Sequence, residues 1–323
     1  MVKDMNKKVV FMYSGQGSQY YNMTEEIYKS NQVFRLCMDS FDRIVREKIG
    51  VSVVEELYNH KCNEFEEFDR LLYTNPLIFM IEYSLTQVIL KKGIYPNYLL
   101  GSSLGVFTCM SVAEMVDPIE MIKALIDISE IVEKECEPGG MIAILEDYHI
   151  FYDSPMLYNN VEMITINSQS HFVVSGLEKN LSKAEAFLKS KRIIYVRLPV
   201  RYGFHSAGID KAKKSIIFRS KEIEIYPPKF KIWNDVRYDQ EIFWNIIREE
   251  INTPNILIKN KTNELIYLDL GIGGTMANIA KGIIGDSEKI YSIILRGQNE
   301  NQKLDSINQI INANEGIKYN GDI

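Results

Sequence analysis

Apolar residues gather along this chain in short runs typical of strands and in longer runs typical of helices. The run KVVFMY (8–13) predicts a buried strand that ends in the glycine-containing turn SGQGSQ. LIFMIEYSLTQVILKKG (77–93) predicts a long helix, and PNYLLG (96–101) predicts a second short strand. The run LGVFTCMSVAEMV (104–116) is apolar on most faces, so it predicts a helix buried in the core.

The segment after this buried run carries a helix start signal. Asp117 precedes Pro118 at the head of PIEMIKALIDISEIVEKE. Aspartate is a favoured N-cap and proline is favoured at the first helical position, so we expect a helix that begins at Pro118.

The hydrophobic pattern changes after the sequence Pro138-Gly139-Gly140. Short apolar runs predict strands and one amphipathic run predicts a helix: strands at 141–145, 163–166, 172–176 and 193–198, and the helix at 177–191. The segment 148–159 has only a weak helical pattern. The order of strand, weak helix, two strands, helix and strand predicts a small ferredoxin-like unit inserted in the chain.

These patterns predict two structural units. Residues 1–139 and 200–323 would form a large unit, and residues 140–199 the small one. ELIYLDLGIGGT (264–275) predicts a strand that runs into a second glycine turn, and the final NANEGIKYNGDI predicts a frayed tail.

Composition excludes several classes of protein. The chain has 323 residues, of which 46% are hydrophobic and 25% charged, as in a globular protein of one or two domains. Its net charge of −6 argues against a nucleic-acid partner, and no apolar run reaches the ~20 residues of a membrane span. The start lacks a signal-peptide pattern, so we expect a cytoplasmic protein. The four cysteines form no CxxC pair, which argues against a metal site: Cys37, Cys62, Cys109 and Cys136.

A serine turn is the first candidate for chemistry. GSSLG (101–105) follows a predicted strand and precedes a predicted helix, which is the G-x-S-x-G pattern of a nucleophile elbow. The register selects Ser103, which has a glycine two residues away on each side, and makes Ser102 its neighbour. A turn of small residues without any chemistry is the alternative interpretation.

A serine nucleophile needs a base, and the chain holds four histidines: His60, His149, His171 and His205. His205 lies in LPVRYGFHSAG, between the two inferred units, where clefts commonly form. It is the favoured base. The other histidines, and a site without a histidine base, stay as alternatives on position alone.

Seven motifs together resemble the malonyl-CoA:acyl-carrier-protein transacylase family, which includes the acyltransferase domains of polyketide synthases. In chain order they are GQGSQ (15–19), TNPLIFMIEYSL (74–85), GSSLG (101–105), INSQSHFVVSG (166–176), FHS (204–206), EINTP (250–254) and LGIGGT (270–275). The resemblance covers nearly the whole chain. It implies an α/β fold, in which an α/β-hydrolase-like large domain carries an inserted small ferredoxin-like domain.

The same resemblance implies roles for individual residues. Ser103 would be the nucleophile that becomes acylated, and His205 the base that takes its proton. A main-chain carbonyl, that of Glu250, would orient the imidazole in place of an aspartate. The main-chain N–H groups of Gln16 and Leu104 would form the oxyanion hole, which suits a glycine turn and a helix start.

Four positions of the expected substrate pocket are Ser102, Asn75, Ile128 and Phe204. Ser102 replaces the histidine that the family elbow usually carries, and Asn75 gives T-N-P where the family has T-Q-P. Val106 likewise stands in place of an acidic or amide residue. Ile128 falls, in an ungapped alignment, where members specific for dicarboxylic acyl groups carry an arginine.

The missing arginine bears on the substrate. The sequence holds no arginine between Arg70 and Arg192, so neither helix after the elbow supplies one. A buried carboxylate without a partner costs several kcal/mol, which disfavours malonyl and favours an uncharged acyl group. Lys123 is the alternative partner for such a carboxylate.

Family members without this arginine look like the acyl hydrolases that accompany polyketide synthases with free-standing acyltransferases. The leading hypothesis is therefore hydrolysis of uncharged acyl groups from an acyl carrier protein. Transfer of an uncharged acyl group to a carrier protein is the second hypothesis, and an inactive homologue that only docks carrier proteins is the third. The resemblance implies no permanently bound cofactor; the 4′-phosphopantetheine of the carrier, or coenzyme A, would be the substrate arm.

Overall fold

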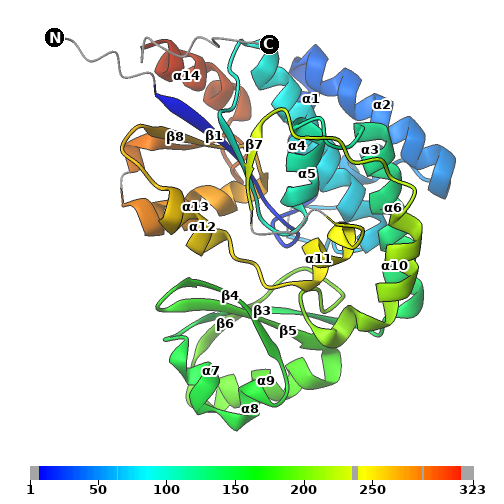
Figure 1. The fold of residues 1–323 in the computed structure, drawn as a ribbon, viewed down its shortest axis with the longest axis vertical. Helices are drawn as coiled ribbons and strands as arrows, with labels where there is room; N and C mark the ends of the chain where they lie inside the picture. The colour runs from blue at the N-terminus through cyan, green and yellow to red at the C-terminus, as the bar shows by residue number, and fades with distance from the viewer. Residues whose placement is uncertain (1–6, 64, 235–238, 286, 314–323) are drawn as a thin grey trace.

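A five-stranded parallel sheet forms the centre of the larger part of the molecule (Figure 1). The structure is a computed structural model that describes residues 7–63, 65–234, 239–285 and 287–313. The strands of this sheet are, in spatial order, β7 (Lys231–Trp233), β2 (Tyr98–Gly101), β1 (Lys8–Tyr13), β8 (Leu265–Asp269) and β9 (Ile290–Ser292). Each neighbouring pair is parallel.

The central strand β1 is covered on both faces, which explains its continuous apolar sequence. Val9, Phe11 and Tyr13 belong to the core that packs against α4, α5 and α6. Val10 and Met12 point to the opposite face, where α12 and α13 cover the sheet (Figure 1).

Helices surround the large sheet and connect its strands. They are α1 (Glu25–Ser30), α2 (Gln32–Ile49), α3 (Val53–Leu57), α4 (Leu71–Lys91), α5 (Gly105–Val112), α6 (Pro118–Glu135), α10 (Lys213–Ser220), α11 (Ile242–Arg248), α12 (Thr253–Asn260), α13 (Thr275–Ile284) and α14 (Glu300–Ala313). Short 3-10 helices are η1 (Ala207–Ala212), η2 (Ile272–Gly274) and η3 (Ser287–Lys289). Among the helices within the described ranges, none combines the length and the hydropathy that a membrane span needs.

The second sheet is antiparallel, with strands in the order β4 (Glu162–Ser168), β5 (His171–Leu177), β3 (Gly139–Leu145) and β6 (Ile194–Arg197). The helices α7 (His149–Asp153), α8 (Pro155–Tyr158) and α9 (Glu178–Lys191) pack on one face of it through a separate apolar core. This order and connectivity are those of a ferredoxin-like unit. The predicted fold class is confirmed, while the boundaries at 139/140 and 199/200 stay a prediction.

The predicted elements agree with the structure except at some of their ends. The helix predicted over 77–93 begins earlier, at Leu71, and the buried helix α5 ends at Val112, before Glu114 with its positive φ of 59°. The weakly helical segment 148–159 forms the two short helices α7 and α8. Asp117 caps α6 as predicted, since its carboxylate accepts the N–H groups of Ile119 and Glu120.

The turns that follow β1, β2 and β8 lie next to one another because the strands end in register. Tyr13 pairs with Gly101, and Met12 pairs with Asp269. The carboxyl ends of parallel strands are the usual place for a site in an open α/β sheet. The predicted tail lies, over 314–323, outside the described residues.

The contact between β1 and α5 leaves no room for a side chain at Gly105, where an added Cβ would overlap the Tyr13 carbonyl. We expect Gly105→Ala to lower the free energy of unfolding by about 3 kcal/mol, because main chain on both sides must move. Gly282→Ala is the matched control: its Cβ would meet nothing within 4 Å in helix α13. That variant should gain about 0.5–1 kcal/mol from helix propensity. Urea unfolding of both variants measures the difference, and equal stabilities would contradict the close packing described for Gly105.

Candidate active site

Ser103 occupies a strained turn between β2 and α5. Its φ is 52°, in the left-handed region that costs a non-glycine residue on the order of 1–3 kcal/mol. The flanking glycines permit the turn, because a Cβ on Gly101 would lie 2.5 Å from the carbonyl carbon of Gly105. Ser103 is therefore held with its side chain at the carboxyl edge of the sheet, as in a nucleophile elbow.

His205 joins Ser103 to a main-chain carbonyl. Ser103 Oγ lies 2.7 Å from His205 Nε2, and His205 Nδ1 lies 2.6 Å from the carbonyl oxygen of Glu249. A carbonyl can only accept, so Nδ1 carries the proton and Nε2 is left as the acceptor for the serine hydroxyl. The structure thus brings Ser103 and His205 together, while their roles as nucleophile and base stay a prediction.

The orienting carbonyl belongs to Glu249, so the prediction of Glu250 was wrong by one residue. Helix α11 ends at Arg248, and the last carbonyls of a helix have no partner inside it. The main-chain N–H of His205 donates to one of them, Ile247 O, at 2.9 Å. That bond places the ring opposite the carbonyl of Glu249, the first residue after α11. The prediction of Glu250 was made by counting back from Pro254, and that count could not show where the helix ends.

Burial sets the charge of His205. Its side chain is only 2% exposed, and desolvation lowers its pKa to about 4. The Glu249 carbonyl acts in the opposite direction by stabilising the protonated ring, while the nearby positive charge of Arg248 lowers the pKa further. The imidazole is therefore neutral at pH 7, the state in which Nε2 can take a proton.

The loop that carries His205 is held by side chains of the small sheet. Like Ser103, His205 has a left-handed backbone, with φ of 61°. Ser175 on β5 donates to the carbonyl of Phe204 at 2.6 Å. Glu162 on β4 accepts the N–H of Ala207, also at 2.6 Å. These bonds fix the main chain immediately before and after the histidine.

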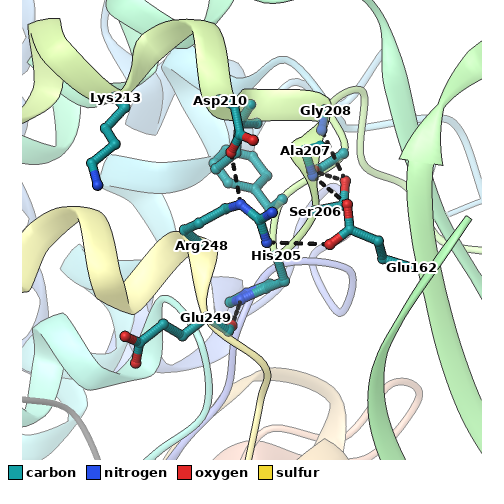
Figure 2. A network of polar contacts seen from close by, with 12 residues as sticks. Glu162, His205, Ser206, Ala207, Gly208, Asp210, Lys213, Arg248 and Glu249 are labelled. Atoms are coloured by element: carbon teal, nitrogen blue, oxygen red, sulfur yellow. Dashed lines mark hydrogen bonds and ion pairs between the residues drawn. The ribbon is translucent and has the colours of Figure 1, made fainter.

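Arg248 connects the same loop to the end of α11. Figure 2 shows its guanidinium between the carboxylates of Asp210 and Glu162. Arg248 Nε donates to Asp210 at 2.7 Å, and Nη1 lies 3.3 Å from Glu162 Oε2. Because Glu249 follows Arg248 directly, this ion-pair network also positions the carbonyl that accepts from His205.

The two residues predicted to form an oxyanion hole lie on either side of Ser103. Leu104 is the N-cap of α5, so its N–H lies where a helix start leaves donors unpaired. Gln16 lies in the turn after β1, and that turn approaches the serine so closely that a Cβ on Gly15 would be 2.9 Å from Ser103 Cβ. The oxyanion role of both N–H groups stays a prediction.

Asn75 has a different position from the predicted one in the substrate pocket. It is 2% exposed, its Oδ1 accepts from the Gln16 side chain at 2.5 Å, and its Nδ2 donates to Ser129. Asn75 is not among the described residues that line the cavity at Ser103. Its two hydrogen bonds connect the Gln16 side chain to Ser129 on α6, so Asn75 supports the turn that carries Gln16. A motif comparison could not distinguish this role from contact with substrate.

Sequence reasoning missed Glu82, which supports the same turns from the core. It is fully buried on α4, and its carboxylate accepts from Ser14 N and Ser14 Oγ and from Thr108 on α5. Burial raises its pKa to about 8, although these hydrogen bonds act to lower it. The signal was present as a single acidic residue inside the apolar run LIFMIEYSL.

A cavity of about 190 Å³, here called the large cavity, opens beside Ser103 between the two sheets. Gln16, Ser102 and Phe204 line it, as predicted for the last two. The apolar part of its wall comes from the small sheet, from the segments after β6 and α11, and from α13: Met141, Ile164, Val173, Leu198, Ile251, Met276 and Ile279. Further polar residues line it: Ser18, Thr165, Asn167, Thr253 and Thr275. Ile128 is 4% exposed in the core of α6 and is not among the described lining residues, so its prediction as a pocket residue was wrong. The ungapped alignment placed Ile128 in α6, but no residue of α6 is among the described residues that line this cavity.

No lysine or arginine is among the described residues that line the large cavity. Lys123 pairs with Glu120 on the outside of α6, and Arg201 pairs with Asp69 at 2.8 Å. Within the described part of the chain, no group of three histidine, cysteine or acidic side chains could hold a metal ion. The site therefore offers nucleophilic and acid–base chemistry beside an apolar cavity.

The remaining histidines have other surroundings. His60 is 70% exposed and pairs with Glu25, and His149 is 60% exposed and pairs with Asp147. His171 is half-buried on β5. The alternatives that position alone left open are thus replaced by His205, which alone among the four contacts Ser103 in the described structure.

Comparison with known proteins gives a consistent result. Residues 10–266 match the acyl transferase domain family. The chain is 39% identical over 314 residues to the polyketide biosynthesis acyltransferase homolog PksD of Bacillus subtilis, covering 94% of this chain and 96% of that protein. It is 34% identical to the homolog BaeD of Bacillus velezensis, covering 95% and 98%.

Solved structures share the fold at low sequence identity. The acyl transferase domain of ZmaA superposes with a TM-score of 0.82 at 20% identity, covering 98% of this chain and 77% of that one. FabD from Acinetobacter baumannii gives 0.78 at 19% identity, covering 95% and 99%. These likenesses support the two-part fold described above.

The geometry predicts that Ser103 is the reactive serine. Ser103→Ala should lose covalent labelling by a serine-directed fluorophosphonate, because Ser102 does not contact His205 in the described structure. Ser102→Ala should keep most of it. Intact-mass analysis with peptide mapping measures the labelling, and an adduct on Ser102 would contradict the assignment.

The lowered pKa of His205 predicts an unusual pH profile. A histidine acts as a base when neutral, so kcat/KM should stay level from pH 8 to below pH 6 and fall only toward the pKa of about 4. An unperturbed histidine would give an acid limb near pH ~6.5. Arg248→Gln removes a positive charge, so its acid limb should move to higher pH. Initial rates across the range, with circular dichroism to check folding, measure the limb; an identical limb in Arg248→Gln would contradict the electrostatic role of Arg248.

Proposed function

The chain belongs to the acyl transferase domain family, and we propose that it is an enzyme of polyketide biosynthesis that hydrolyses uncharged acyl groups from acyl carrier proteins. The observation that carries the proposal is the Ser103–His205–Glu249 arrangement beside an apolar cavity without a cationic lining residue in the described structure. The polyketide context rests on the two relatives of similar length, which are named as polyketide biosynthesis acyltransferase homologs.

In the proposed first half-reaction, Ser103 Oγ attacks the carbonyl carbon of the acyl thioester and its proton passes to His205 Nε2. The developing oxyanion accepts hydrogen bonds from the N–H groups of Gln16 and Leu104. The C–S bond then breaks, the thiol leaves with the proton from Nε2, and the acyl group stays on Ser103 as an ester. The Glu249 carbonyl keeps the proton on Nδ1 throughout, and it favours the imidazolium that forms for part of the cycle.

The proposed acyl group is uncharged because the large cavity would leave a carboxylate unpaired. The wall is mostly apolar, and its polar members among the described residues carry no positive charge. A buried charge without an ionic partner costs several kcal/mol even after relaxation. A methyl or methylene group there gains instead about 0.8 kcal/mol for each CH₂ that it buries. The apolar wall thus supports acetyl and longer chains over malonyl.

The proposed partner is an acyl carrier protein, whose 4′-phosphopantetheine arm would bring the thioester to Ser103. Coenzyme A carries the same arm and is the small-molecule alternative. The large cavity lies between the two sheets and reaches residues of intermediate exposure, including Gln16, Gly17 and Ser18. This position supports entry of a thioester arm along the cleft.

Transfer of an uncharged acyl group to a second thiol is the alternative function. It shares the first half-reaction and differs only in the group that discharges the acyl-serine. The names of the relatives as acyltransferase homologs favour it. A protein that only docks carriers is disfavoured, since docking needs neither the strained Ser103 nor a buried neutral histidine.

The proposal predicts a preference among acyl groups. Acetyl or longer uncharged acyl thioesters of carrier proteins should have kcat/KM at least about tenfold above malonyl, which corresponds to ~1.4 kcal/mol. The measurement is a panel of acyl-carrier proteins incubated with the enzyme and followed by intact mass, with Ser103→Ala as the inactive control. Free carrier protein and free acid indicate hydrolysis, whereas a mass gain on a second carrier indicates transfer. Equal or better use of malonyl would contradict the proposed substrate class.

A further inference from the structure

A second cavity adjoins Ser103 on the side of His205. Its volume is about 60 Å³, and it is here called the small cavity. Ser103 lines both cavities, whereas His205 lines the small cavity and is not among the described residues that line the large one. The serine therefore lies at a junction, with the apolar cavity on one side and the imidazole on the other.

The wall of the small cavity is polar over much of its area. Polar side chains come from the segment before α11, from α11 itself and from the start of α12: Asn234, Asn245, Asn252 and Thr253. The wall also includes Glu249 and Glu250 after α11, Val106 on α5 and isoleucines at 246, 251 and 256. Ile251 and Thr253 line the large cavity as well. A buried water needs polar partners and takes about 30 Å³ in the liquid, so the space suits about two water molecules. It is too small for a pantetheine arm.

The two cavities differ in what they can offer to an acyl-serine. The acyl chain gains most from the apolar large cavity, which Gln16 with its oxyanion N–H also lines. The group that discharges the acyl-serine must reach the acyl carbon on Ser103 and the base Nε2 together. Among the two cavities, only the small one is lined by both Ser103 and His205 in the described structure.

We propose that the small cavity holds the water that hydrolyses the acyl-serine intermediate. The water oxygen attacks the acyl carbon, and one of its protons passes to His205 Nε2. The bond between the acyl carbon and Ser103 Oγ then breaks, and Oγ takes the proton back from Nε2. A carboxylic acid and the free serine are the products. The inference rests on the proposed hydrolysis and adds the site from which the water acts.

Two observations support discharge of the acyl-serine by a water molecule in this cavity. His205 is neutral at pH 7 because burial lowers its pKa, so it is ready to take the proton of a water molecule. The side chain of Val106, at the start of α5, is short and leaves the space beside Ser103 open. A longer side chain at 106 would extend into the small cavity, where water would otherwise lie.

The test measures how the acyl-enzyme is discharged. The full chain is acylated with an acetyl thioester of N-acetylcysteamine, and the release of acetate and the transfer of acetyl to an added thiol are followed together. Val106→Ile adds one methyl group to the wall of the small cavity, so hydrolysis of the acyl-enzyme should slow about tenfold, as expected when one well-bound water is displaced. Acyl-enzyme should then accumulate in the intact-mass spectrum.

The matched control is Val112→Ile, the same change at the last residue of the same helix. Val112 lies in the core and is not among the described residues that line either cavity. It should leave the ratio of hydrolysis to transfer at the wild-type value. Thr253→Val is a second test that does not depend on filling space, because it removes a hydroxyl at almost constant volume. Thr253 lines both cavities, so the rate of acylation is measured as well, and only hydrolysis of the acyl-enzyme should slow several-fold.

The outcomes separate this inference from the function on which it rests. A wild-type acyl-enzyme that only a thiol can discharge would contradict the proposed hydrolysis and the water site together. Wild-type hydrolysis that stays unchanged in both Val106→Ile and Thr253→Val would contradict the water site alone. Slower hydrolysis in either variant, with the Val112→Ile ratio unchanged, supports it.

Discussion

His205 is both buried and required to exchange a proton, and the rest of the site meets this constraint. A buried imidazole without a partner on Nδ1 could adopt either tautomer and could turn in its cavity. The bond from Nδ1 to the Glu249 carbonyl, at 2.6 Å, removes both freedoms. A carbonyl has no negative charge, so it orients the ring and raises its pKa less than a carboxylate would. Desolvation then keeps the imidazole neutral at the pH at which Nε2 must accept a proton.

The position of that carbonyl depends on contacts of the small sheet with α11 and with the loop after His205. Glu162 on β4 binds the loop after His205 and the guanidinium of Arg248, and Arg248 ends the helix that presents Glu249 (Figure 2). One carboxylate of the small sheet thus links the histidine to its orienting residue.

On the other side of Ser103, buried carboxyl groups hold the turns of the large sheet. Glu82 binds Ser14 at the end of β1 and Thr108 in α5, and Asp269 binds Gly271 and Ala277 after β8. Burial raises the pKa of both carboxyl groups, to about 8 and about 7. Their stabilising role therefore lies in hydrogen bonds to main-chain and hydroxyl groups. These bonds hold the turns that lie next to the strained turn of Ser103, whose φ is 52°.

The sequence alone determined what depends on neighbouring residues. β1, the capped start of α6 and the Gly101–Ser103–Gly105 turn follow from apolar runs, an N-cap and glycine spacing, and all of them appear where expected. Motif order also identified His205, although it lies 102 residues from Ser103. Tertiary structure decided that Glu249 rather than Glu250 orients the ring, that Asn75 supports the Gln16 turn, and that Ile128 is core. Each of these depends on where a helix ends, or on which face it turns inward, when segments distant in the sequence pack together. His205 and Glu249, for example, are 44 residues apart. A local pattern fixes that a helix exists, but its final turn and its rotation are set by the contacts of its whole surface, which no short stretch of sequence contains.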